Sequence, residues 1–186
     1  RFASRQALDH IIHFGAFHEQ MVVAWGKLYK AELFEGIRYP VGRIHEDEFT
    51  TYKLLDKAGK IAFTTEPLLY YWQRADSIMG EGFKLKNKLD YLDALKERAA
   101  YFHAYGQSDY SDKSYRSLFT ESLAAILTLD EQNDADGKKA VIEKLAAARQ
   151  ALKVSGKQKL NSLYAAFLAF PNVVTPVYKV IKTIKK

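Results

Sequence analysis

Cysteine is absent from this chain of 186 residues, which excludes a disulfide framework, thiolate chemistry and a zinc site built on thiolates. Long hydrophobic runs are also missing: no apolar stretch reaches the roughly 18 residues that span a bilayer, and we expect no signal peptide. These features suit a reducing cytoplasm. The content of 48% hydrophobic and 27% charged residues is that of an ordinary globular protein of one domain or slightly more.

Over residues 1–82, short apolar segments alternate with loop signals, which predicts a mixed α/β fold with a partial sheet. Ser4 is placed to cap the first helix. Because Arg1 is not a methionine and falls within a helical pattern, we expect a fragment whose N-terminal portion is missing. The expected helices cover residues 4–20, 27–34 and the segment from the acidic residues to Lys57, and the expected strands cover residues 21–25, 61–64 and 68–73.

From residue 83 onward the apolar residues recur at helical spacing. Short polar connections separate predicted helices near residues 83–105, 112–129, 137–152 and 157–169, as in packed antiparallel helices. The change in pattern predicts two domains, residues 1–82 and residues 83–186, of which the second is mostly helical.

Residues 42–49 gather four ionisable side chains in a row: His45, Glu46, Asp47 and Glu48. Adjacent carboxylates repel one another, so their clustering needs a physical reason. One reason is a helix N-terminus, where acids complement the macrodipole. Another is catalysis, in which one carboxylate accepts a proton from a substrate hydroxyl. The residues alone leave both interpretations open.

A metal site is the weaker interpretation of the histidines. His10 and His13 are three residues apart on a predicted helix, but no carboxylate joins them at ligand spacing. A metal-dependent hydrolase built on His45, Glu46 and Asp47 fails on spacing, because adjacent residues on a helix point in different directions. We predict surface or half-buried histidines and no metal ligands in this chain.

Four pieces of the sequence, taken in order, resemble family 2 glycosyltransferases, the inverting GT-A type that bacteria use to build capsule, exopolysaccharide and wall glycans. The pieces are Trp25-Gly26-Lys27-Leu28-Tyr29-Lys30, Ile37-Arg38-Tyr39-Pro40-x-Gly42, His45-Glu46-Asp47-Glu48 and Tyr70-Tyr71-Trp72-Gln73-Arg74-x-x-Ser77-Ile78. Each piece is weak alone, whereas their order makes the resemblance specific over roughly residues 5 to 80. It implies that residues 1–82 are the acceptor-side half of a GT-A-like domain and that residues 83–186 are a variable C-terminal extension.

The resemblance implies a role for several residues. Asp47 matches the catalytic base that deprotonates the acceptor hydroxyl, which then displaces the nucleoside diphosphate with inversion. Glu46 matches a neighbour that contacts or orients the acceptor. Gln73, Arg74 and Ser77 match a segment near the diphosphate, where a guanidinium can bind phosphate oxygens.

Aromatic side chains accompany these motifs. Rings at Trp25, Tyr70, Tyr71 and Trp72 could stack on sugar faces, and we expect one of them to do so while the others form core or wall. Trp25, Tyr71 and Trp72 are the acceptor-binding candidates.

The resemblance also implies a divalent cation, Mg²⁺ or Mn²⁺, held with the donor diphosphate by an Asp-x-Asp motif. No such motif stands in the matching context, because the acids from Asp109 to Asp112 lie far downstream between predicted helices. We therefore expect this chain to carry the acceptor-side base without the donor site, and to be unable to transfer sugar alone. Lys27 and Tyr29 belong to the matched motif without an assigned role.

Residues 160–186 join an aromatic-rich apolar stretch to a basic end that contributes to the formal net charge of +6. Prolines interrupt the stretch, which argues against a membrane span. One interpretation is a terminal helix packed on the others with solvated lysines. The other is adhesion of residues 171–186 to an anionic membrane at the inner face of the plasma membrane, where a lipid-linked acceptor would be found.

The sequence thus predicts a cytoplasmic, membrane-peripheral glycosyltransferase that takes a nucleotide-sugar donor and a glycan or lipid-linked acceptor, with no nucleic-acid partner. The alternative is a non-catalytic helical module at the membrane, in which the acidic row serves only as a helix start.

Overall fold

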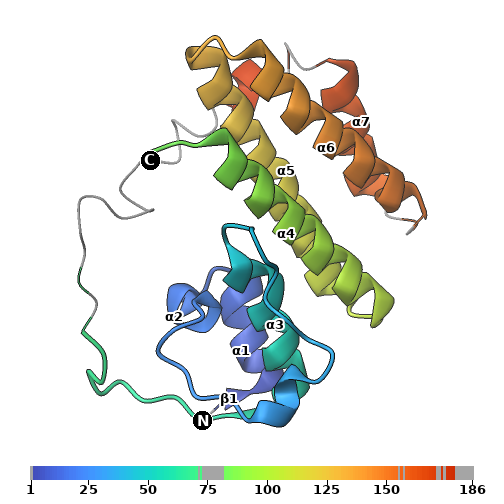
Figure 1. The fold of residues 1–186 in the computed structure, drawn as a ribbon. Helices are drawn as coiled ribbons and strands as arrows, with labels where there is room; N and C mark the ends of the chain where they lie inside the picture. Colours follow the sequence, from blue (N-terminus) through green and yellow to red (C-terminus); the bar gives the residue numbers. More distant parts are fainter. Residues whose placement is uncertain are drawn as a thin grey trace. The chain divides into compact units, whose positions relative to one another are not determined.

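A computed structural model describes residues 2–70, 72, 82–154, 156, 158–170, 173 and 175–178. The chain divides into two compact units, Arg1–Ala94 (unit 1) and Leu95–Lys186 (unit 2), with the division inside a long helix. The helices are α1 (Ser4–Ile12), α2 (His18–Val22), the 3-10 helix η1 (Ala31–Phe34), α3 (Glu46–Ala58), α4 (Leu85–Ala104), α5 (Ser108–Glu131), α6 (Ala135–Val154) and α7 (Gln158–Ala169) (Figure 1).

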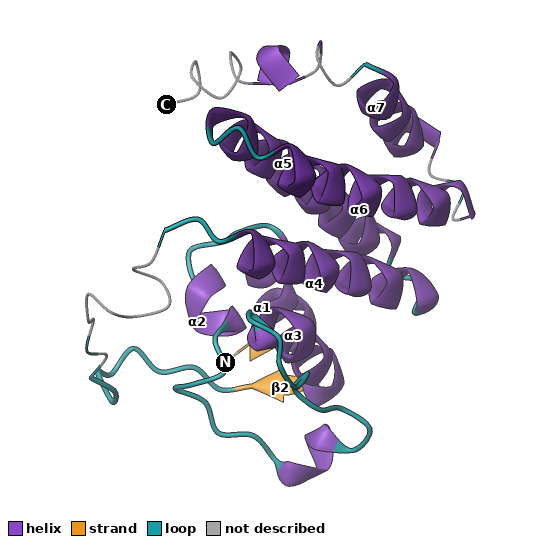
Figure 2. Cartoon of the chain, turned by 45° about the horizontal axis from the view of Figure 1, so that its top comes forward, coloured by secondary structure: helices purple, strands orange, loops and turns teal. Residues whose placement is uncertain are grey.

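The predicted α/β fold, with a partial GT-A-like mixed sheet over residues 1–82, is wrong. Helices dominate the described residues, and strand among them is confined to β1 (Phe2–Ala3), which pairs antiparallel with β2 (Lys60–Ile61) (Figure 2). Residues 21 and 22 end α2, pairing in the predicted strand 61–64 stops at residue 61, and residues 68–70 and 72 form no strand. A run of four to six apolar residues fits a helix end or a loop as well as a strand, and only a pairing partner decides.

The helix predicted over residues 4–20 is two helices, α1 and α2. Between them Phe14 has a φ of 51°, and the chain passes so close to α1 that a Cβ at Gly15 would lie 2.5 Å from His10 Nδ1. Ala3, rather than Ser4, precedes α1 as its N-cap, and its backbone N–H donates to Gln6 Oε1 at 2.9 Å. The break lets α1 and α2 pack against each other and both pack on α3.

The core of unit 1 lies between α1 and α3. Helix α3 ends before Gly59, as predicted, where φ is 71°. The buried apolar residues of the two helices are Ala7, Leu8, Ile11, Ile12, Phe49, Tyr52, Leu54 and Leu55. Because burying each large apolar side chain contributes roughly 1.5–3 kcal/mol, this packing fixes α3 and positions the acidic residues at its N-terminus.

Unit 2 is helical, and the helices predicted near 83–105, 112–129, 137–152 and 157–169 are confirmed as α4 to α7. Within it, α6 packs on α5 and α7. The buried Arg98 Nε donates to Ser114 Oγ at 3.2 Å, and the Tyr164 hydroxyl donates to the carbonyl of Tyr115 at 2.6 Å. In the part of the chain that the structure describes, no helix is both long and apolar enough to cross a membrane.

Candidate functional site

The loop that leads into α3 is fixed to α4 by the carboxylate of Asp90. Its Oδ1 lies 2.5 Å from Arg43 Nη1, and its Oδ2 accepts the backbone N–H of Ile44 at 3.1 Å. The Lys86 ammonium is 3.8 Å away, and the Asp90 side chain is only 6% exposed. Burial opposes ionisation, but the bonds from Arg43 and Ile44 outweigh it and hold the pKa of Asp90 below its ordinary value.

His45 joins this loop to α3 in a conformation that non-glycine residues rarely adopt. Its φ of 62° and ψ of 37° place it in the left-handed region, which disfavours a residue with a Cβ by about 1 kcal/mol or more. Its ring centroid lies 5.1 Å from that of Tyr91. The anchored loop and this ring contact therefore hold a strained residue at the point where the helix begins.

The three carboxylates at the start of α3 occupy different environments. Glu46, Asp47 and Glu48 form the first turn, and successive residues on a helix point about 100° apart. Glu46 is exposed, Asp47 is half-buried and Glu48 is buried. Asp47 Oδ1 accepts the backbone N–H of Glu48 at 2.8 Å. The acids do start the helix, and Asp47 is also partly withdrawn from water.

The environment of Asp47 favours its protonated form. Burial raises the pKa of Asp47, the N–H of Glu48 opposes this shift, and the charges of Glu48 and Glu46 add to it. A carboxylate with a raised pKa is a stronger proton acceptor than an ordinary aspartate. An acid that only complements a helix dipole is stabilised in its charged form, which has the opposite effect on its pKa.

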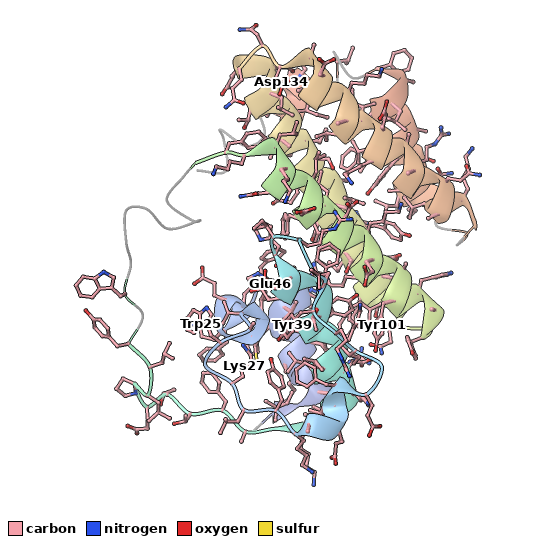
Figure 3. All side chains as sticks on the ribbon, in the orientation of Figure 1. Trp25, Lys27, Tyr39, Glu46, Tyr101 and Asp134 are labelled. Carbon is pink, nitrogen blue, oxygen red and sulfur yellow. The ribbon has the colours of Figure 1, made fainter. Side chains whose placement is uncertain are left out.

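A lysine and two tyrosines from the segment between α2 and α3 lie within range of the Asp47 charge. Figure 3 labels two of them, Lys27 and Tyr39, together with Glu46, the neighbour of Asp47 in the sequence. Burial lowers the pKa of Lys27 to about 8, and the Asp47 carboxylate partly offsets this shift. Lys27 Nζ donates to the carbonyl of Val23, which caps α2. Burial also raises the pKa of Tyr29 and of Tyr39. Asp47 therefore shares its surroundings with a cation that loses its charge near pH 8.

Hydroxyl groups gather in the same place. The Tyr29 and Tyr39 hydroxyls are close enough for each to affect the pKa of the other, and the Thr51 hydroxyl lowers both pKa values. Thr51 is fully buried, and neither its Oγ1 nor the Tyr29 hydroxyl completes a hydrogen bond of ordinary geometry within the described residues. The three hydroxyls are neighbours, not a formed chain of hydrogen bonds.

Helix α3 also positions the segment that carries these tyrosines. Lys57 Nζ donates to the carbonyls of Glu32 at 3.1 Å and Glu35 at 3.2 Å, which fixes η1 to the C-terminal end of α3. The Phe34 ring of η1 lies 5.5 Å from the ring of Tyr29 and 6.1 Å from that of Tyr39. The C-terminal end of α3 thus holds η1, and η1 in turn contacts the two tyrosines that lie within range of the Asp47 charge.

The structure describes four of the predicted site residues. Glu46 and Asp47 are adjacent but face differently, and Trp25 is 48% exposed in the loop after α2. Trp72 is 69% exposed, with its ring 6.1 Å from that of Tyr70. The other four predicted site residues lie outside the described residues, so the expected placement of Arg74 across from Asp47 stays a prediction; the four are Tyr71, Gln73, Arg74 and Ser77.

Sequence reasoning did not assign a role to Lys27 or Tyr29, and it did not single out Tyr39 or Thr51. Lys27, Tyr29 and Tyr39 all stand in the sequence pieces that carry the family resemblance. That membership is the signal that marks them. Thr51 carries no such signal, because a buried threonine on a helix is ordinary core.

The described residues contain no group of three or more His, Asp or Glu side chains that could hold a metal ion. The histidines near α1 have local contacts: the His10 ring lies 5.2 Å from Phe17, and His18 Nδ1 is 3.0 Å from the carbonyl of Ile11. The cation that the resemblance implies therefore has no fitting set of ligands among the described residues.

Comparison with known proteins finds partial similarity to two glycosyltransferases of Streptococcus pneumoniae serotype 4. A segment of 58 residues, 31% of this chain, is 36% identical to glycosyltransferase GlyA and covers 8% of it. A segment of 95 residues, 51% of this chain, is 32% identical to glycosyltransferase GlyG and covers 30% of it. No family model matches the chain, and no solved structure matches it either. The similarity is distant, and the chain spans less than a third of either relative.

We predict that Asp90→Asn lowers the free energy of unfolding by about 1–3 kcal/mol, because the substitution removes the charge that Arg43 and Lys86 face. Since the folded pKa of Asp90 lies below the ordinary 3.8, its contribution is present above pH 3.8 and is lost as pH falls through the folded value. Urea unfolding at pH 7 and pH 3 measures both effects. Asp93→Asn is the matched control, since Asp93 also contacts Arg43, at the longer distance of 3.1 Å, and is 28% exposed. Equal losses in the two variants would contradict the anchoring role of Asp90.

We predict that the stability of the chain rises with pH between about 8 and 10.5 because of Lys27. In that window the unfolded lysine holds its proton and the folded one does not, so the penalty for burying the charge disappears as pH rises. Allowing for solvent screening, the rise is about 1–2 kcal/mol. It should be absent from Lys27→Met and present in Lys30→Met, whose side chain is 81% exposed in wild type. Parallel pH profiles for wild type and Lys27→Met would rule out a buried, charge-penalised amine.

Proposed function

We propose that this chain contributes the acceptor-side part of an inverting glycosyltransferase, with Asp47 as the base that deprotonates the acceptor hydroxyl. The observation that carries the proposal is the half-buried carboxylate of Asp47 at a strained helix start, with its pKa raised by burial and with Lys27 nearby. The partial similarity to glycosyltransferases GlyA and GlyG supports it. Asp47 is thus a carboxylate with a raised affinity for a proton, in a chain that is partly similar to two glycosyltransferases.

In the proposed reaction, the acceptor oxygen forms a bond to the anomeric carbon on the face opposite the leaving group. The proton of the acceptor hydroxyl passes to Asp47, and the bond from the anomeric carbon to the nucleoside diphosphate breaks, taking its electron pair with it. A positioned base of this kind contributes about 10²–10⁴-fold to the rate. Burial makes Asp47 more basic, while the N–H of Glu48 and the neighbouring His45 oppose this shift of its pKa. Glu46, exposed beside Asp47, is placed to contact other acceptor hydroxyls.

The proposal also includes recognition of the donor, for which the support is the family resemblance. We propose a nucleotide-sugar donor, contacts from Gln73, Arg74 and Ser77 to its diphosphate, and a divalent cation held outside the described residues. A glycan or lipid-linked molecule is the proposed acceptor, and capsule, exopolysaccharide or wall-glycan synthesis is the proposed process. Trp25 and Trp72 are both exposed, as a ring that stacks on a sugar face must be, and the same contact is proposed for Tyr71.

A second candidate function is a non-catalytic module in which the acidic row only starts α3. The observations that favour it are the position of Glu46, Asp47 and Glu48 in the first turn, and the hydrogen bond from the Glu48 N–H to Asp47. The two candidates differ in what Asp47 does for stability. A dipole-complementing acid stabilises the helix by about 0.3–1 kcal/mol, whereas a partly buried base does not.

We predict that Asp47→Asn in the full-length protein that carries this sequence lowers kcat by about 10²–10⁴-fold and leaves the KM for the donor nearly unchanged. The measurements are sugar transfer from a nucleotide-sugar and, in parallel, the free energy of unfolding at pH 7. That free energy should stay level or rise, because the substitution removes a partly buried charge.

Glu46→Gln is the matched control, because it alters the adjacent exposed carboxylate and should reduce kcat far less. Unchanged turnover in Asp47→Asn, together with a loss of stability, would support the non-catalytic module. The 186-residue chain alone, assayed with the same donor and acceptor, is expected to show no transfer. Robust transfer by the 186-residue chain alone would contradict the proposal that it carries the acceptor-side base without the donor site.

A further inference from the structure

Helix α7 carries apolar residues on two faces, of which the bundle covers only one. Leu160, Tyr164 and Phe167 are 4% exposed or less and make up the inner face, which packs on α5 and α6. These residues recur at the spacing of a single helical face. This face alone accounts for the packing of α7 within unit 2.

The opposite face of α7 is exposed and still mostly apolar. Leu163 is 43% exposed and Phe170 is 63% exposed. The face also includes alanines and a lysine but no carboxylate, and we define the outer face of α7 as Lys159, Ser162, Leu163, Ala166, Ala169 and Phe170. A helix that meets water is normally polar on its outer side, as α6 is with Lys139, Glu143 and Gln150.

The apolar character continues beyond the last residue of α7. Phe170 N–H donates to the carbonyl of Ala166 at 2.9 Å, so the helical turn extends to Phe170. Val173 is 63% exposed and Val177 is 54% exposed. Leu163 and Phe170 are seven residues apart and form an apolar stripe on α7, and Val173 and Val177 add exposed apolar residues after it in the sequence.

The sequence around this stripe carries charge of one sign only. Glu143 is the last acidic residue in the chain, and every charged residue after it is basic. The basic residues after Glu143 are Lys144, Arg149, Lys153, Lys157, Lys159, Lys179, Lys182, Lys185 and Lys186. Because the net charge of the whole chain is only +6, the positive charge is concentrated in this part of the sequence.

We propose that the outer face of α7 docks on an anionic lipid bilayer, with its apolar side chains at the boundary between headgroups and acyl chains. An apolar stripe flanked by lysines and free of acids is the pattern of a helix that lies in a membrane interface. Each basic residue near an anionic surface strengthens the attraction, and Lys159 can extend its stem along the apolar face to reach a headgroup. This extends the expected membrane contact of residues 171–186 to residues of α7 that the structure describes.

Other occupants fit the surface less well. A second copy of the chain would bring two segments of like charge together, which opposes association. A nucleic acid would meet the lysines but would leave Leu163 and Phe170 in water. The docking does not depend on sugar transfer, so it stands or falls separately from the proposed function.

The test is flotation of the full 186-residue chain with vesicles of phosphatidylcholine alone and of phosphatidylcholine with phosphatidylglycerol. We expect the chain to float with the anionic vesicles, to float much less with the neutral ones, and to be released as salt is raised, since screening weakens the lysine contribution. Absence of binding to anionic vesicles at low salt would overturn the proposal. Equal binding to both kinds of vesicle would overturn its electrostatic part.

Two substitutions on the outer face locate the contact. Phe170→Glu and Leu163→Glu should each lower the vesicle-bound fraction roughly tenfold, because each replaces an apolar contact by a charge that the lipid repels. Tyr105→Glu is the matched control, since Tyr105 is 66% exposed in the same unit and lies outside the stripe. Circular dichroism verifies folding, and Phe170→Ser is the milder substitute if Phe170→Glu unfolds. Undiminished binding by folded variants, or a dimer that these substitutions dissociate, would overturn the proposal.

Discussion

The carboxylate of Asp90 is the constraint on which the geometry of unit 1 depends. It is a buried residue of α4, binds Arg43 and the backbone of Ile44, and so fixes the end of the loop that enters α3. The chain can then hold His45 in a left-handed conformation and begin the helix at Glu46. Without such an anchor a strained residue at this point would relax and the first turn of α3 would rotate or fray. The buried carboxylate of Asp90 thus helps to position the carboxylate of Asp47 at the start of α3.

The consequence is a carboxylate in an unusual electrostatic setting. A helix N-terminus ordinarily stabilises an ionised acid, whereas burial beside two other acids destabilises it, and at Asp47 the second effect is the larger. Lys27 experiences the same burial and loses affinity for its proton. Partial burial thus raises the pKa of Asp47 and lowers the pKa of Lys27, so the two pKa values lie closer together than in water. Groups whose pKa values are shifted by burial and by a specific charged neighbour occur often at functional sites, which is the physical reason to propose this one.

Local patterns in the sequence predicted part of the fold. The long helices of unit 2 and the helix that ends before Gly59 followed from periodicity and a glycine stop, because those signals span many residues. The predicted sheet was wrong, because segments 21–25 and 61–64 are too short for their sequence to distinguish a strand from a helix end or a loop. Whether such a segment pairs as a strand depends on distant residues. The break at Phe14 and Gly15 depends on a close approach to His10, which no local pattern encodes. Motif order predicted a role for Asp47, which stays a prediction. The partial burial that distinguishes Asp47 from the exposed Glu46, and the proximity of Lys27, depend on how the loops fold.

The most direct test of the account is the pKa of the Asp47 carboxyl group itself, measured by carbon NMR titration of the 186-residue chain. The account predicts a value above the ordinary 3.8 of aspartate, which decreases in Glu46→Gln because the neighbouring charge contributes to the shift. A value at or below 3.8, unaffected by that substitution, would show that Asp47 is stabilised in its ionised form as a helix-starting acid. The proposal that it serves as a base would then fail.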